Sequence, residues 1–97
     1  MTSRDEYVAK LSAQLEQWSA QIVAWESAAR QAKAEVKSES EKQVGILKSR
    51  LDDLLFRMEQ LKGASSDAWQ EIERGAEEAR KAMHDAFDRA RARFKDL

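Results

Sequence analysis

The sequence predicts an all-α protein, in which a long coiled-coil helix is followed by a shorter antiparallel helix and the resulting helical hairpin belongs to an oligomeric bundle. Charged residues make up 36% of the 97 residues, and the sequence contains no proline and no cysteine. This composition is typical of long helices and coiled coils. Apolar residues recur at alternating steps of three and four, and one glycine-containing segment interrupts them near residue 63.

The first helix is expected to begin at about residue 4. Ser3 with Glu6 three residues later forms a capping-box pattern, and Asp5 and Glu6 place negative charge where a helix N-terminus favours it. From there a heptad stripe continues through Val8, Leu11, Leu15, Trp18, Ile22, Trp25, Ala29, Ala32 and Val36.

The apolar pattern changes phase after Val36. The next apolar residues follow a shift equivalent to four inserted residues, which is a stutter in a coiled coil. Residues 37–43 contain no proline or glycine, and Lys37 and Glu41 form an i,i+4 pair, so a continuous helix from about residue 4 to residue 62 is favoured. Gly45 favours the alternative, a break between about residues 38 and 45 that would give a three-helix bundle.

A turn is expected at residues 63–66. Gly63 can take a left-handed C-terminal cap, and Ser66 or Asp67 can cap a second helix from about residue 67 to residue 96. One face of this helix gathers its apolar residues: Trp69, Ile72, Ala76, Ala79, Met83, Ala86, Phe87, Ala90, Phe94 and Leu97.

The lengths of the two helices predict self-association. At 1.5 Å per residue the first helix would be roughly 90 Å long and the second roughly 45 Å, so the second covers only half of the first. The uncovered row would then form an oligomer interface, and burial of each large side chain would contribute about 1.5–3 kcal/mol. The interface residues are Val8, Leu11, Leu15, Trp18, Ile22 and Trp25. An antiparallel homodimer is the preferred arrangement, with a trimer or tetramer as alternatives.

The sequence favours a non-enzymatic protein that uses no cofactor and no metal. His84 is the only histidine and falls outside the apolar face, and the adjacent carboxylates of Asp52–Asp53 and Glu77–Glu78 point about 100° apart on a helix. A net charge of −1 argues against nucleic acid as a partner. The opening residues lack the apolar run of a secretory signal and cysteine is absent, so a cytoplasmic protein is expected.

A lipid surface is the alternative partner. Residues 67–97 repeat their apolar positions every eleven residues and end in a basic cluster, as some peripheral lipid-binding helices do. Half of this apolar face is alanine, which offers little insertion energy, and dipole complementarity explains basic residues at a helix C-terminus. A protein partner is therefore preferred to a membrane surface.

Two segments of the sequence carry a resemblance to known proteins. The N-terminal segment comprises Ser3-Arg4-Asp5-Glu6-Tyr7-Val8, Lys10-Leu11, Gln14-Leu15 and Trp18, and the C-terminal one comprises Ser66-Asp67-Ala68-Trp69, Gly75, Ala86-Phe87-Asp88 and Phe94. Both resemble a family of small, poorly characterised bacterial coiled-coil proteins described as stress-related. The resemblance implies a bacterial helical protein that is induced under stress and has no defined active site. Together with the stripe, it predicts a homo-oligomeric coiled-coil protein with a structural or interaction role.

Overall fold

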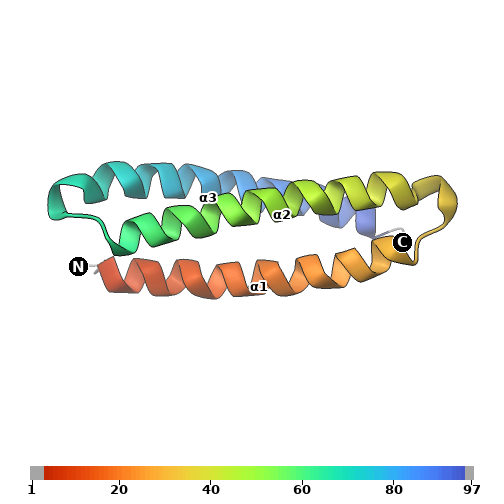
Figure 1. The fold of residues 1–97 in the computed structure, drawn as a ribbon, viewed down its shortest axis with the longest axis horizontal. Helices are drawn as coiled ribbons and strands as arrows, with labels where there is room; N and C mark the ends of the chain where they lie inside the picture. Colours follow the sequence, from red (N-terminus) through yellow and green to blue (C-terminus); the bar gives the residue numbers. More distant parts are fainter. Residues whose placement is uncertain (1–3, 96–97) are drawn as a thin grey trace.

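Three helices of similar length form an up-down-up bundle in the computed structural model, which describes residues 4–95 (Figure 1). They are α1 (Arg4–Arg30), α2 (Ala34–Lys62) and α3 (Ser66–Phe94). The bundle measures 51 × 17 × 17 Å, and α1 and α3 run parallel to each other and antiparallel to α2. The predicted all-α class is confirmed, whereas the hairpin of one long and one short helix is wrong.

The predicted continuous helix from residue 4 to residue 62 ends at Arg30, and the chain reverses at residues 31–33. The N–H of Gln31 donates to the carbonyls of Ser27 and Ala28, and Lys33 then adopts an extended conformation with φ −61° and ψ 150°. Within the part of the chain that the structure describes, no residue has a positive φ. This reversal therefore needs neither glycine nor proline, and their absence was no evidence for a continuous helix.

The phase change after Val36 reflects two separate helices and not a stutter in one. The buried stripe of α1 ends at Ala29, and that of α2 begins at Ser40. Val36, which the heptad pattern placed in the seam, is 42% exposed. The alternative prediction of a three-helix bundle had the correct number of helices but the wrong break, since residues 38–45 lie inside α2.

The second reversal occupies residues 63–65 and differs in detail from the expectation. Gly63 has φ −97° and ψ 2°, so it is not left-handed, and its N–H donates to the carbonyl of Glu59. The N-cap of α3 is Ser65, whose Oγ accepts a hydrogen bond from the N–H of Ala68 at 3.3 Å. Ser66 and Asp67 are thus inside the first turn. The predicted capping residue Ser3 and the predicted face residue Leu97 lie outside the described residues.

The core consists of one buried stripe from each helix, and these stripes share a spacing. Six apolar positions of α1 recur 36 residues later in α2, and this interval is about ten turns at 3.6 residues per turn. The pairs are Val8 with Val44, Leu11 with Leu47, Leu15 with Leu51, Trp18 with Leu54, Ile22 with Met58, and Trp25 with Leu61. The same interval leads from α2 to Met83, Phe87, Ala90 and Phe94 of α3.

Candidate functional site

The six residues predicted as an oligomer interface lie in the core of the single chain. Val8 is half-buried against that core, and the other five are at most 8% exposed; these are Leu11, Leu15, Trp18, Ile22 and Trp25. The expectation that they lack a partner within the chain is wrong. The expectation failed because the chain reverses at residues 31–33, which folds α2 back along α1 (Figure 1). Ring contacts from Tyr7–Trp69 to Trp25–Phe94 bring α3 against α1 as well.

Six aromatic rings join α1 to α3; Tyr7 meets Trp69 edge-on, and the other four stack or tilt against one another. The ring centroids of Trp18 and Phe87 lie 5.5 Å apart, those of Trp25 and Phe87 lie 5.1 Å apart, and those of Trp25 and Phe94 also lie 5.1 Å apart. Trp25 and Phe94 are nearly parallel, with 7° between their planes. Large flat side chains thus fill the space between the two parallel helices, and their stacking adds to the free energy of area burial.

A polar cluster fixes the N-terminal end of α1 against α3. The Tyr7 hydroxyl donates to Glu77 Oε2 at 2.8 Å, and Arg80 Nη2 lies 2.6 Å from Glu77 Oε1. The guanidinium of Arg4 lies 4.4 Å from the centroid of the Trp69 ring and donates to the carbonyl of Ala64. These contacts tie α1 to α3 and to the turn that precedes it.

The electrostatics of this cluster favour a structural role for Tyr7. Burial, followed by the hydrogen bond to Glu77, raises the pKa of the Tyr7 phenol far above its usual value near 10. The Arg80 hydrogen bond lowers the pKa of the Glu77 carboxyl and raises that of Arg80 itself. At neutral pH the phenol is therefore a neutral donor and the other two groups form an ion pair, which leaves no free base among the three.

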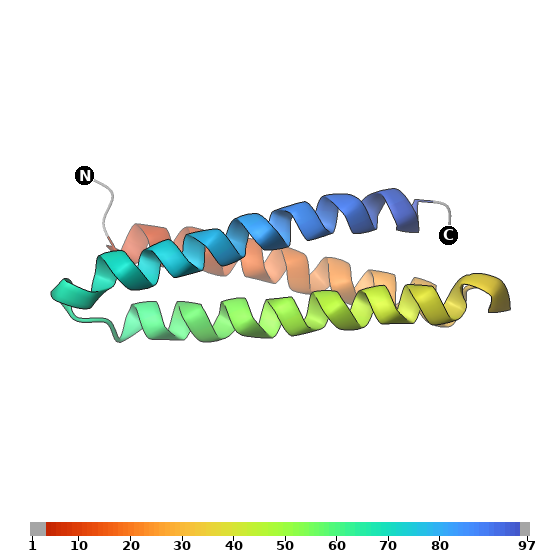
Figure 2. The same ribbon diagram turned by 90° about the horizontal axis from the view of Figure 1, so that it is seen from above.

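Several hollows on the described surface are partly open to solvent. One of about 270 Å³ lies beside Tyr7, Lys10 and Arg80, and one of about 750 Å³ lies at the α1–α2 turn between Lys33, Ser40 and Arg93. At this turn the first residues of α2 project beyond the last turn of α3 (Figure 2). A third, of about 260 Å³, is bounded by Ala29, Val44 and the ion pair between Glu26 and Lys48.

The side chains that sequence analysis considered for chemistry are exposed, except for the half-buried Glu77. His84 is exposed, with its Nε2 atom 3.5 Å from Asp88 Oδ2. Within residues 4–95 no group of three or more histidine, cysteine, aspartate or glutamate side chains is placed to hold a metal ion. Glu77 contacts Arg80 and Tyr7, whereas Asp53 pairs with Arg57 at 3.0 Å.

The apolar face of α3, which suggested a lipid surface, packs inside the bundle. Met83, Phe87 and Ala90 are at most 3% exposed, so contact with lipid would require α3 to leave α1 and α2. In the described part of the chain, no helix is long and apolar enough to cross a membrane.

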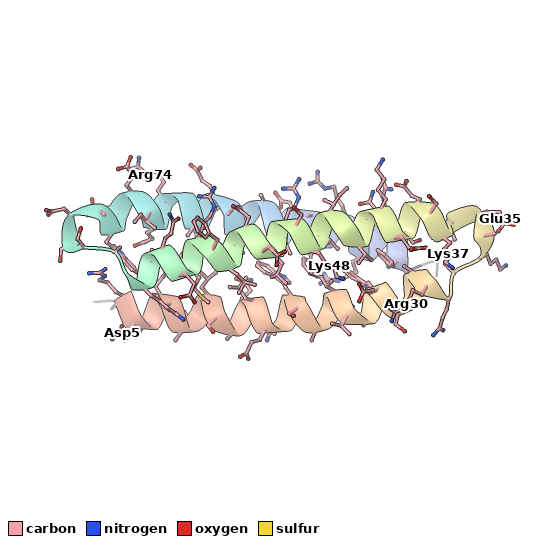
Figure 3. The ribbon with its side chains drawn as sticks, viewed as in Figure 1. Asp5, Arg30, Glu35, Lys37, Lys48 and Arg74 are labelled. Carbon is pink, nitrogen blue, oxygen red and sulfur yellow. The ribbon has the colours of Figure 1, made fainter. Side chains whose placement is uncertain are left out.

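Long-range polar contacts are the features that sequence analysis missed. Glu26 on α1 pairs with Lys48 on α2, which lies on the side of that helix facing α1 (Figure 3), and Glu39 pairs with Arg93 on α3 at 2.9 Å. Their partners are 22 and 54 residues apart in the sequence. No local pattern predicts such pairs, although the 36-residue interval between the stripes was visible and would have indicated three equivalent helices.

In comparisons with known proteins, no model of a protein family, no curated protein and no solved structure matches this chain. The stress-related family therefore stays a prediction from the quoted residues.

Proposed function

We propose that this chain is a non-enzymatic, homo-oligomeric helical protein with a structural or interaction role, and that its functional form is a dimer. The proposal is carried by the apolar side chains that the bundle leaves exposed. Within the described residues, the large apolar side chains that are exposed belong to α1 and α2; they are Val23, Val36, Ile46, Leu55 and Phe56.

The outer surface of α2 provides the strongest support. Phe56 is 62% exposed and follows the fully buried Leu54 by two residues, so it points about 200° away from the core stripe. Ile46 and Leu55 are 39% and 38% exposed. Because α2 carries large apolar residues on several sides, it can pack against more helices than the two that its own chain supplies.

The charge of the chain is compatible with association between copies. Acidic and basic residues nearly balance, at 18 and 17, and many of them pair within or between helices. A surface with this balance produces no strong repulsion between identical molecules.

The stress association in this proposal rests on the resemblance alone. Its test is the abundance of the protein in its source cells before and after oxidative, osmotic and heat stress. A rise under at least one stress is expected, and constant abundance under all three would remove this part of the proposal.

Sedimentation equilibrium tests the association itself. The intact chain should show twice the mass of one chain as its concentration rises from the low micromolar to the submillimolar range. Val36→Glu places a charge on an exposed apolar position without touching the core, so it should weaken the dimer. A single-chain mass at every concentration contradicts the homo-oligomer.

A further inference from the structure

The equal spacing of the α1 and α2 stripes has a geometric meaning. Six pairs of core positions are separated by 36 residues, about ten helical turns, so in one straight helix both stripes would lie on the same face. A helix from residue 4 to residue 62 would be roughly 90 Å long and would carry one apolar face from end to end.

The turn at residues 31–33 is well suited to become helical. Gln31, Ala32 and Lys33 all have high helix propensity, and Lys33 lies outside the helical region, with φ −61° and ψ 150°. A change in ψ at Lys33, together with helical conformations at Gln31 and Ala32, would join α1 to α2. The other turn contains Gly63 and the capping residue Ser65, which oppose a continuous helix there.

We propose that the dimer forms by exchange of α1 between two copies of this chain. In each copy α1 and α2 join into one long helix, and α1 packs on α2 and α3 of the second copy, where the second copy's own α1 would otherwise lie. The core contacts are the same in both states, so the exchange costs little packing energy. This inference rests on the proposed homo-oligomer and joins its two copies through α1 and Val36. It leaves Phe56 and Leu55 as exposed as they are in the single chain.

The residues near the crossover gain contacts that one chain cannot make. The Glu26–Lys48 pair sets the register of α1 against α2. Lys33 is seven residues after Glu26, and Glu41 is seven residues before Lys48. In the exchanged dimer this register therefore places Lys33 of one copy opposite Glu41 of the second copy, as a pair of opposite charge. Lys37 lies at the centre of the same register and meets its own copy there, with Glu41 one turn away on each chain.

Val36 supplies an apolar contact at the same place. It is 42% exposed in the single chain although it continues the α1 stripe by seven residues from Ala29. The centre of the register falls beside it, so Val36 of one copy packs against Val36 of the other. Exchange thus buries an apolar residue that the separate bundle leaves in water.

Paired cysteines distinguish the exchanged dimer from other dimers, because the chain has no cysteine of its own. One full-length variant carries Glu26→Cys with Lys48→Cys, across α1 and α2. The matched control carries Glu39→Cys with Arg93→Cys, across α2 and α3, which exchange of α1 leaves in one chain. Each dimer fraction is oxidised and then denatured without reductant.

Exchange of α1 predicts a covalent dimer from the first variant and a covalent monomer from the control. A sedimenting dimer that gives covalent monomers from both variants overturns the exchange and leaves the proposed dimer standing. Covalent dimers from the control alone place the opening at residues 63–65 and also overturn it. A single-chain mass at every concentration overturns both proposals.

Lys33→Pro provides an independent test with the intact chain. The φ of Lys33 suits proline in the turn, whereas proline in the interior of a long helix is strongly unfavourable. The substitution should preserve the bundle and weaken dimerisation by about ten-thousandfold, because each of the two copies contributes a penalty of about a hundredfold. Lys33→Ala, the control, should dimerise at least as well as the wild type. Unchanged dimerisation of Lys33→Pro overturns the exchange.

Discussion

Six aromatic side chains connect α1 to α3, and Trp25 of α1 contacts two of those on α3. Its ring lies 5.1 Å from both Phe87 and Phe94, and the side chain is 8% exposed. Heptad spacing predicted that Trp25 lies on an apolar face, but single-sequence reasoning could not identify its partners about 60–70 residues away. The choice between a partner in the same chain and one in another chain depended on the turn at residues 31–33.

Trp25→Ala should lower the free energy of unfolding by about 3–5 kcal/mol, as large-to-small substitutions in a packed core do. Urea unfolding followed by circular dichroism measures the change. Val23→Ala is the matched control on the same helix, because Val23 is 61% exposed and its truncation should change stability by about 0.5 kcal/mol or less in the single-chain state. Equal effects of the two substitutions would contradict the assigned faces of α1.

Tyr7, the only tyrosine in the sequence, gives the bundle a measurable dependence on alkaline pH. Its pKa is raised above the usual value near 10 in the folded state, first by burial and then by Glu77. The proton is therefore held more tightly in the folded state, so this contribution to stability is present below pH 10 and is lost as pH rises above it.

Tyrosinate absorbance should consequently appear well above pH 10 in the native protein, or only together with loss of helix. Glu77→Gln removes the carboxylate and should shift the absorbance change toward lower pH. Native protein that titrates near pH 10 with full helicity would show that the Tyr7 hydroxyl does not form the buried contact with Glu77.

At the scale of single elements, the N-terminus of α3 offers a clear comparison between adjacent serines. Ser65 caps the helix and Ser66 begins it, although the sequence pattern favoured Ser66 or Asp67 as the cap. Ser65→Ala should cost about 1 kcal/mol of stability, whereas Ser66→Ala should change it by about 0.5 kcal/mol or less. Thermal or urea unfolding of both variants measures this, and a larger effect at Ser66 would place the cap one residue later.

Helix propensity makes a second prediction at this scale. A Cβ at Gly45 meets nothing within 4 Å, so Gly45→Ala should stabilise α2 by about 0.5–1 kcal/mol. At Gly75 the added Cβ would lie 2.8 Å from Arg57 Nη1 and would have to displace the end of that flexible side chain. Gly75→Ala should therefore stabilise the protein less than Gly45→Ala, and the reverse order by urea unfolding would contradict the environments of these two glycines.

The helical class and the apolar faces could be predicted because both depend on local periodicity. The reversal at residues 31–33 could not be predicted, because Gln31, Ala32 and Lys33 are good helix formers. The chain turns there because the α1 stripe is buried against α2 and α3. Gly45, the apparent weak point, lies inside α2. Tertiary packing thus placed the break where the sequence has no breaker.

For the whole molecule, a two-helix hairpin would leave half of its long helix uncovered, but the chain forms three helices. With three helices of 27, 29 and 29 residues, each stripe finds neighbours along its entire length. The repeated interval of 36 residues, from Leu11 to Leu47 to Met83, was the available sequence evidence for this equivalence. No such interval predicts the polar cluster of Tyr7, Glu77 and Arg80, because its contacts depend on the parallel register of α1 and α3.

The distance between residues 26 and 48 within one chain tests the bundle most directly. Spin labels are attached through Glu26→Cys and Lys48→Cys, and labelled chains are measured by pulsed electron paramagnetic resonance at a concentration where sedimentation shows single chains. The bundle predicts a short distance, set by an interaxial separation of about 8–10 Å and the label linkers. A distance of about 33 Å, the length of 22 residues of continuous helix, would contradict it.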